Sequence, residues 1–226
     1  MRSEALLRLL QVSDSAFPTG AFAHSLGLEA FAEAGELGSA ADLSRVVRLH
    51  LSAMSTSDCV ALRAAYGETS LEKLFYVDRL LAATKLTREL RAASSATGKR
   101  FLLSVAALGV ESETLGDFAG SVRSGSSPGN LAVGYGVVGP ALGIGVEEAL
   151  HAYLFASVAS LVAAGQKLVP LGGSVAQRVL YELGAEIEDT AQMSETLEVE
   201  EMHAFSPTVD ARSMMHERQR TRLYVS

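Results

Sequence analysis

Apolar residues recur along this chain at intervals of three and four, and this spacing is the feature that most constrains the fold. Such intervals place apolar side chains on one face of an α-helix. Two clear stripes are formed by Leu43, Val46, Val47, His50 and Leu51, and by Leu71, Leu74, Phe75 and Leu81. Alternation of β-branched and polar residues, which is typical of strands, is scarce. The chain therefore predicts an all-α fold.

Signals for the starts and ends of helices divide the chain into about eight to ten segments. Ser39 precedes Asp42 by three residues, and Thr114 precedes Asp117 in the same way, as in capping boxes. Glycines at C′ positions are predicted to end three helices, at Gly35, Gly67 and Gly109. The predicted helices cover residues 3–12, 23–34, 40–55, 57–66, 71–84, 86–108, 114–123, 131–143, 146–166 and 173–190. Short polar connections favour one antiparallel, single-domain bundle over residues 1–190.

Residues 191–226 differ in charge from the bundle and are predicted to form a mobile C-terminal tail. From Val179 to Ala211 there are nine acidic residues and no Lys or Arg. Four arginines then follow within the last fifteen residues, at positions 212, 218, 220 and 222, after Pro207. An acidic-then-basic tail of this kind typically becomes ordered on a partner.

Charge and composition exclude several classes of protein. The net charge of −7 argues against a nucleic-acid partner, which requires a basic surface. Cys59 is the only cysteine, so neither an intramolecular disulfide nor a cysteine-rich metal site can form. The N-terminus lacks the features of a secretory signal, and the charge-free stretch 130–146 is short for a membrane span and contains Pro140. We expect a cytoplasmic protein that does not associate with membranes.

The segment from Gly134 to Gly139 matches the GxGxxG pattern of dinucleotide-binding sites, but its context does not. Pro140 follows it, Ala159 and Ser160 stand where an acidic residue is needed, and no βαβ unit is visible. Close packing of helices explains the segment better, because Ala132, Gly136, Gly139 and Gly143 allow a neighbouring backbone to approach. We predict no cofactor.

No arrangement of side chains indicates catalysis or a dedicated metal site. Ser25 lies beside His24, but adjacent residues of a helix point apart, and Cys59 lies in an apolar segment where a thiol usually packs. The five histidines form no HxH or HxxxH pair, and they are His24, His50, His151, His203 and His216. A site of soft donors shared between several chains remains conceivable, because methionines adjoin His203 and His216. We predict a protein that is not an enzyme.

Five blocks of sequence, in order and with matching spacing, resemble the UreF family of urease accessory proteins. The blocks are LLQVSDSAFPTGAFAHSLGLEAFAEAGEL at 9–37, TRELRAASSATGKRFL at 87–102, NLAVGYGVVGPALGI at 130–144, KLVPLGGSVAQRVL at 167–180 and SPTVDARSMMHERQRTRLYVS at 206–226. Four positions depart from the family pattern. They are Ala21 for a glycine, His24 for a frequent aromatic residue, Asn130 for a frequent histidine, and Gly134 for a larger residue.

The resemblance implies an all-α homodimer that has no reaction of its own and works through protein contacts. UreF proteins bridge the accessory protein UreD (also called UreH) and the GTPase UreG, and the assembly delivers nickel to the urease apoprotein. Residues that match the GTPase-linked stretch are Lys167, Pro170, Leu171 and Gly172, followed by Gln177 and Arg178. Residues of the tail implied to bind UreD/UreH are Arg212, His216, Glu217, Arg222, Leu223 and Tyr224. We expect the tail to lie at a distance from Lys167.

Lys167 has two interpretations that the sequence leaves open. Its ammonium group could stabilise the last turn of an apolar helix, where cations are favoured. It could also be reached by a partner beside the Pro-Leu-Gly turn.

Two further classes compete with an accessory role: a helical small-molecule-binding or regulatory protein with a pocket between helices, and an enzyme whose site is not recognised. Tight ligand binding by the isolated protein would favour the first, and turnover without partners would favour the second.

Overall fold

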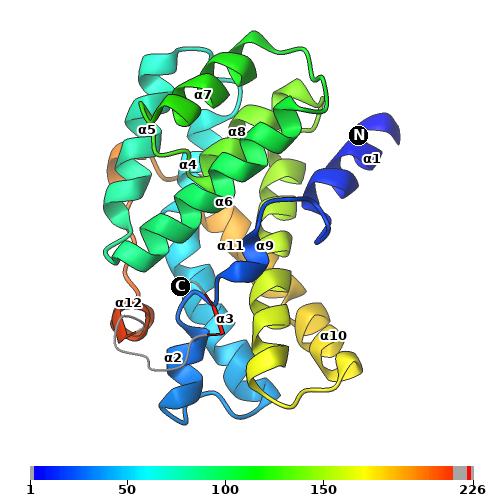
Figure 1. The fold of residues 1–226 in the computed structure, drawn as a ribbon, viewed down its shortest axis with the longest axis vertical. Coiled ribbons are helices and arrows are strands. Elements are labelled where there is room, and N and C mark those ends of the chain that lie inside the picture. Colours follow the sequence, from blue (N-terminus) through cyan, green and yellow to red (C-terminus); the bar gives the residue numbers. More distant parts are fainter. Residues whose placement is uncertain (1–2, 216–222, 225–226) are drawn as a thin grey trace.

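The computed structural model describes residues 3–215 and 223–224, and this part of the chain is a single all-α domain without strands (Figure 1). The all-α prediction is confirmed. The α-helices are α1 (Ser3–Ser13), α2 (Leu28–Glu33), α3 (Ala40–Ser55), α4 (Asp58–Ala65), α5 (Leu71–Thr84), α6 (Arg88–Ala106), α7 (Glu113–Ser124), α8 (Leu131–Ala141), α9 (Val146–Leu168), α10 (Gly173–Glu182), α11 (Gly184–Met193) and α12 (Pro207–Met215). Two 3-10 helices, η1 (Ala21–Ala23) and η2 (Val199–Glu201), complete the described elements.

The long apolar helix α9 is the centre of the domain. It packs against α1, α2, α3, α4, α8, α10 and α11, and Figure 1 shows it running along the long axis of the molecule. Its length and composition would also suit a membrane span, but 56% of its apolar window is buried inside the domain. This burial is what the core helix of a globular bundle requires.

Helix ends follow the predicted signals in most places. The Ser39 side chain accepts a hydrogen bond from the backbone N–H of Asp42, as a capping residue should. All three predicted C′ glycines, at positions 35, 67 and 109, have φ between 73° and 76°, a conformation that favours glycine. The capping box at Thr114 was a wrong prediction, because α7 begins one residue earlier and Ser112 is its N-cap.

Two predicted helices are interrupted in the structure. The helix predicted at 23–34 begins only at Leu28, because Leu26 and Gly27 both have positive φ and turn the chain before it. The helix predicted at 173–190 is two helices, α10 and α11, which meet at the fully buried Leu183. The bend allows both helices to pack against α3 and α9.

Glycines of the GxGxxG segment serve close packing between α8 and α4. A Cβ atom added to Gly136 would lie 2.5 Å from the carbonyl oxygen of Leu62, and one added to Gly139 would lie 3.0 Å from the Tyr66 ring. The packing prediction holds for these two glycines. It is wrong for Gly143, which has a φ of +71° just after α8 and no neighbour within 4 Å of an added Cβ.

Asn130, one of the departures from the family pattern, is fully buried at the start of α8. Its side-chain amide donates to the carboxylate of Asp78 on α5 at 2.7 Å and to the Asp78 carbonyl oxygen at 2.9 Å. The same carboxylate accepts from the hydroxyl of Ser127 and the backbone N–H of Gly129. This buried network joins α5 to α8 and gives position 130 a structural role.

The segment treated as a tail in the sequence analysis is divided by the structure. The boundary at residue 190 falls inside α11, and α12 packs against α2, α3 and α6 with Val209 and Ser213 buried. Residues 216–222 and 225–226 lie outside the described part of the chain.

Candidate partner-binding surface

The C-terminal end of α9 and the turn that follows it present the residues predicted to engage a partner. Lys167 is exposed in the last turn of the helix, and the backbone N–H of Val169 still donates to the carbonyl oxygen of Gly165. Pro170 cannot extend the helix, and Leu171 closes a tight turn by donating its N–H to the Val169 carbonyl oxygen at 2.7 Å. The turn therefore leaves Lys167 and Pro170 accessible.

Helix α10 continues this surface. Gly172 is its N-cap and is exposed, as are Gln177 and Arg178 further along. Ala176 and Val179 are the buried residues of the helix, so its inner face is fixed against the domain. The predicted residues of α10 are thus held on a rigid element and point outward.

The C-terminal residues Leu223 and Tyr224 lie against the same end of α9, and the expectation of a distant tail is wrong. The Tyr224 hydroxyl donates to the carbonyl oxygen of Ala164 at 3.2 Å. The Lys167 ammonium lies 5.6 Å from the centroid of the Tyr224 ring, within the range of a cation–π interaction. Only 6% of Tyr224 is exposed, whereas Leu223 is 69% exposed. The two groups of predicted partner-binding residues therefore meet at one place.

Glu29 on α2 also contributes to this surface, although no sequence motif includes it. Its carboxylate accepts the backbone N–H of Leu223 at 2.8 Å although Glu29 is only 5% exposed. Burial, followed by the negative charge of Glu29, raises the pKa of Tyr224 above its usual value. The helix sequence LEAFAE also carries the exposed Glu33, so only the burial of Glu29, between the buried Leu28 and Ala30, distinguishes it.

Arg212 faces the domain. Its guanidinium forms an ion pair with Glu36 and lies 5.9 Å from the centroid of the Phe31 ring. These contacts hold α12 beside α2. The other predicted tail residues, His216, Glu217 and Arg222, lie outside the described part of the chain.

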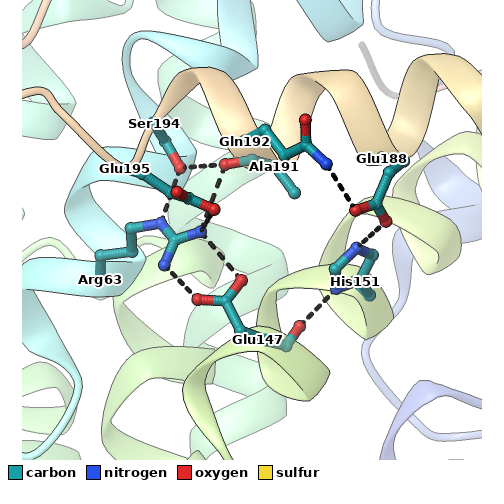
Figure 2. A network of polar contacts seen from close by, with 8 residues as sticks. All are labelled: Arg63, Glu147, His151, Glu188, Ala191, Gln192, Ser194 and Glu195. Atoms are coloured by element: carbon teal, nitrogen blue, oxygen red, sulfur yellow. Dashed lines mark hydrogen bonds and ion pairs between the residues drawn. The ribbon is translucent and has the colours of Figure 1, made fainter.

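A polar network fastens α11, and with it the α10–α11 pair, to α4 and α9 (Figure 2). Arg63 of α4 donates to both carboxylate oxygens of Glu147, at 2.5 and 3.0 Å, and to the hydroxyl of Ser194. The hydrogen bond from Arg63 lowers the pKa of Glu147. His151 of α9 bridges the Glu147 carbonyl oxygen and the Glu188 carboxylate, each at 2.7 Å. Burial lowers the pKa of His151, but these bonds outweigh it and raise the pKa overall.

The described part of the chain brings together no group of three or more His, Cys, Asp and Glu side chains that could hold a metal ion. The surface at the end of α9 offers the accessible ammonium of Lys167, the exposed Pro170 and Gly172 of the turn, and the exposed Leu223, with the buried Tyr224 ring beneath them. Such amphipathic combinations are typical of contact surfaces.

Comparison with known proteins gives a consistent result. The UreF family model matches residues 37–184. Urease accessory protein UreF of Paenarthrobacter aurescens (strain TC1) is 38% identical over 221 residues, which cover 97% of each chain. The protein of the same name from Arthrobacter sp. (strain FB24) is 37% identical over 97% of this chain and 96% of its own. That of Corynebacterium glutamicum (strain R) is 30% identical over the full length of both chains.

Proposed function

This chain belongs to the UreF family of urease accessory proteins, and from this premise we propose that it bridges UreD/UreH and the GTPase UreG during delivery of nickel to the urease apoprotein. In this role nickel is the cargo of the assembly. The chain itself contributes surfaces and performs no reaction. The match extends over nearly the whole chain at up to 38% identity, which supports a shared role as well as a shared fold.

The contact between Lys167 and Tyr224 is the observation that carries the proposal. It places the residue implied to engage the GTPase next to the segment implied to bind UreD/UreH. Both partners would then bind at adjoining sites on the same end of α9. Two proteins that bind adjacent parts of one rigid helix end are held in a fixed mutual orientation, which is what a bridging subunit must provide.

We further propose that the chain forms a homodimer in the cytoplasm. Helix α1 supports this, because it lies at the edge of the molecule (Figure 1), and three of its leucines are exposed. Leu6, Leu7 and Leu10 are 43%, 67% and 56% exposed, and their spacing of three and four residues places them side by side. An exposed apolar stripe of this kind is commonly covered by a protein partner.

The proposal is tested by Lys167→Ala, with Lys73→Ala as a matched control. Lys73 is an exposed lysine on α5 whose ammonium lies 3.3 Å from the carboxylate of Glu68. Urease, UreD/UreH and UreG are co-expressed with each variant, and nickel-dependent urease activity and retention of UreG are measured at equal protein abundance. Lys167→Ala should lower both sharply with little change in melting temperature, because an exposed charge at a helix end contributes only about 0.3–1 kcal/mol.

Lys73→Ala should behave as the unchanged protein. Binding of UreD/UreH should persist in Lys167→Ala, since the hydrogen bond from Tyr224 to Ala164 does not involve the lysine side chain. Normal activation of urease by Lys167→Ala would assign Lys167 to helix stabilisation and remove it from the proposed surface.

A further inference from the structure

Helix α11 buries little apolar surface of its own. Its buried residues are Ile187, Thr190 and Ala191, and of these only Ile187 has a large apolar side chain. Segments with few buried apolar contacts open more readily than the core of a domain. The polar side chains that reach α11 from other helices therefore contribute a large part of its attachment.

Three basic side chains in the described part of the chain hold α11 from three other helices. Arg48 of α3 and His151 of α9 form ion pairs with its carboxylates, and Arg63 of α4 donates to the carbonyl oxygen of Ala191. An arginine keeps its charge at every physiological pH, whereas a histidine titrates near neutrality. Among these three contacts, the one made by His151 is therefore the one that a change of pH near neutrality alters.

Both ring nitrogens of His151 face oxygen atoms that accept hydrogen bonds (Figure 2). Nδ1 lies 2.7 Å from the carbonyl oxygen of Glu147, and Nε2 lies 2.7 Å from a carboxylate oxygen of Glu188. The other oxygen of that carboxylate accepts from the side-chain amide of Gln192 at 2.9 Å, which fixes its orientation. A neutral imidazole has one N–H donor, whereas an imidazolium has two. Both hydrogen bonds form together only when the ring carries both protons.

The charges around His151 favour the doubly protonated ring. Glu188 of α11 and Glu147 of its own helix act on it, while Arg63 of α4 pairs with Glu147 and lies 3.9 Å from Glu195. Burial lowers the pKa of His151, but its hydrogen bonds and the two carboxylates raise the pKa overall. The hydrogen bond from His151 in turn lowers the pKa of Glu188. Because the His151 side chain is 38% exposed, its protons exchange with solvent.

Loss of one proton from His151 removes one of the two hydrogen bonds, whichever nitrogen keeps the other proton. If Nδ1 keeps it, the lone pair of Nε2 faces the negatively charged Glu188. If Nε2 keeps it, the ring still donates to Glu188 but has no positive charge, and the carbonyl oxygen of Glu147 loses this donor. In both cases the ion pair between α9 and α11 is lost, and charge-assisted hydrogen bonds are the stronger ones.

We propose that His151 makes the attachment of α11 sensitive to pH near neutrality, because the doubly protonated ring holds α11 on α9 through Glu188 and loss of a proton weakens this contact. The fold raises the pKa of His151 above its ordinary value of 6.5. The stabilisation is therefore present in full below pH 6.5 and is lost as the pH rises through the higher value of the folded protein. The proposal concerns α11 alone and does not depend on the proposed partners.

Hydrogen exchange of the α11 amides in the full-length protein measures how often this helix opens. Exchange is followed from about pH 6 to about pH 8.5, across the range in which histidine titrates, and each rate is corrected for the intrinsic pH dependence of amide exchange. In the unchanged protein, opening of α11 should increase about two- to fivefold over this range, as expected for a partly exposed ion pair.

Three variants separate the proton from the rest of the side chain. His151→Gln is never charged and His151→Lys is charged throughout, so both should lose most of the pH dependence, with α11 opening more often in the glutamine variant. His203→Gln is the matched control. The His203 ring also lies against a backbone carbonyl, with Nδ1 2.8 Å from that of Glu201, but it forms no ion pair among the described residues. Its variant should keep the pH dependence of the unchanged protein.

A second measurement does not depend on the stability of any variant. The ¹⁵N resonances of the His151 ring in the unchanged protein should show both nitrogens protonated at about pH 6, with a titration midpoint above that of an ordinary histidine. A ring with one proton at this pH would overturn the proposal. So would opening of α11 that does not change with pH, or a pH dependence that persists undiminished in His151→Gln and His151→Lys.

Discussion

At the scale of single residues, the structure places two histidines in opposite environments. His50 faces the Lys85 ammonium and the Asp58 carboxylate, and burial is the main reason that its pKa falls to about 4. His151 lies at the surface between an acceptor carbonyl and the Glu188 carboxylate, and its pKa is raised. The sequence placed His50 on an apolar stripe, but it could not reveal which charges face either ring, because those charges come from other helices.

The low pKa of His50 predicts a specific loss of stability in acid. Between pH 6.5 and about 4 the unfolded chain binds a proton on this residue that the folded chain excludes. The free energy of unfolding should therefore fall as the pH is lowered through this window, by up to about 3 kcal/mol. Urea unfolding at intervals across the window measures this. His50→Leu should show a shallower pH dependence than His203→Leu, and equal slopes would contradict the assignment.

At the scale of elements, helix positions follow from the sequence, whereas contacts between helices do not. The caps at Ser39 and at the C′ glycines are local signals, so they could be read directly. The break at Leu183 has only a weak local signal, the Gly184 that begins α11, and it is the packing of both α10 and α11 against α3 and α9 that the sequence does not reveal. Tyr224 contacts Ala164 of α9, which lies 60 residues earlier in the sequence, and no local pattern predicts such a distant contact.

Close approach of α8 to α4 predicts that replacing Gly136 by alanine destabilises the protein, whereas the same replacement at an uncrowded helical glycine should stabilise it. Gly136→Ala should lower the free energy of unfolding by about 1–3 kcal/mol, because the added Cβ would lie 2.5 Å from the Leu62 carbonyl oxygen. Gly120→Ala on α7 meets nothing within 4 Å and should raise stability by about 0.5–1 kcal/mol through helix propensity. Chemical denaturation compares the two, and a Gly136→Ala protein as stable as the unchanged protein would refute the packing role.

Because α12 packs on the domain and the residues after it are separate from that packing, truncations before and after α12 should have different effects. Removing residues 216–226 deletes Leu223 and Tyr224 but keeps α12 and its buried Val209. We expect the helical circular dichroism to persist and binding to UreD/UreH to be lost in a pull-down. Removing 207–226 should also reduce stability, because α12 covers part of α2 and α6. Retention of UreD/UreH by the shorter truncation would exclude this segment from the interface.

At the scale of the whole molecule, the leucine stripe of α1 predicts the oligomeric state. Light scattering at micromolar concentration should give about twice the chain mass of 23.8 kDa. Leu7→Glu should shift the protein towards the monomer, because it places a charge within the stripe, whereas Leu108→Glu serves as a control at another exposed leucine. A monomer at high concentration, or a dimer unaffected by Leu7→Glu, would count against this surface.

The central position of α9 also has a consequence for how the chain folds. Helices α1, α2 and α3 pack against α9, which comes much later in the chain. The hydrogen bond between Tyr135 and Val12 likewise joins residues that are 123 positions apart. Chain entropy opposes such distant contacts until many residues are ordered together. The N-terminal helices therefore gain their packing surface only once α9 is in place. We expect refolding to be slower than in bundles built from neighbouring helices, with α9 as part of the nucleus.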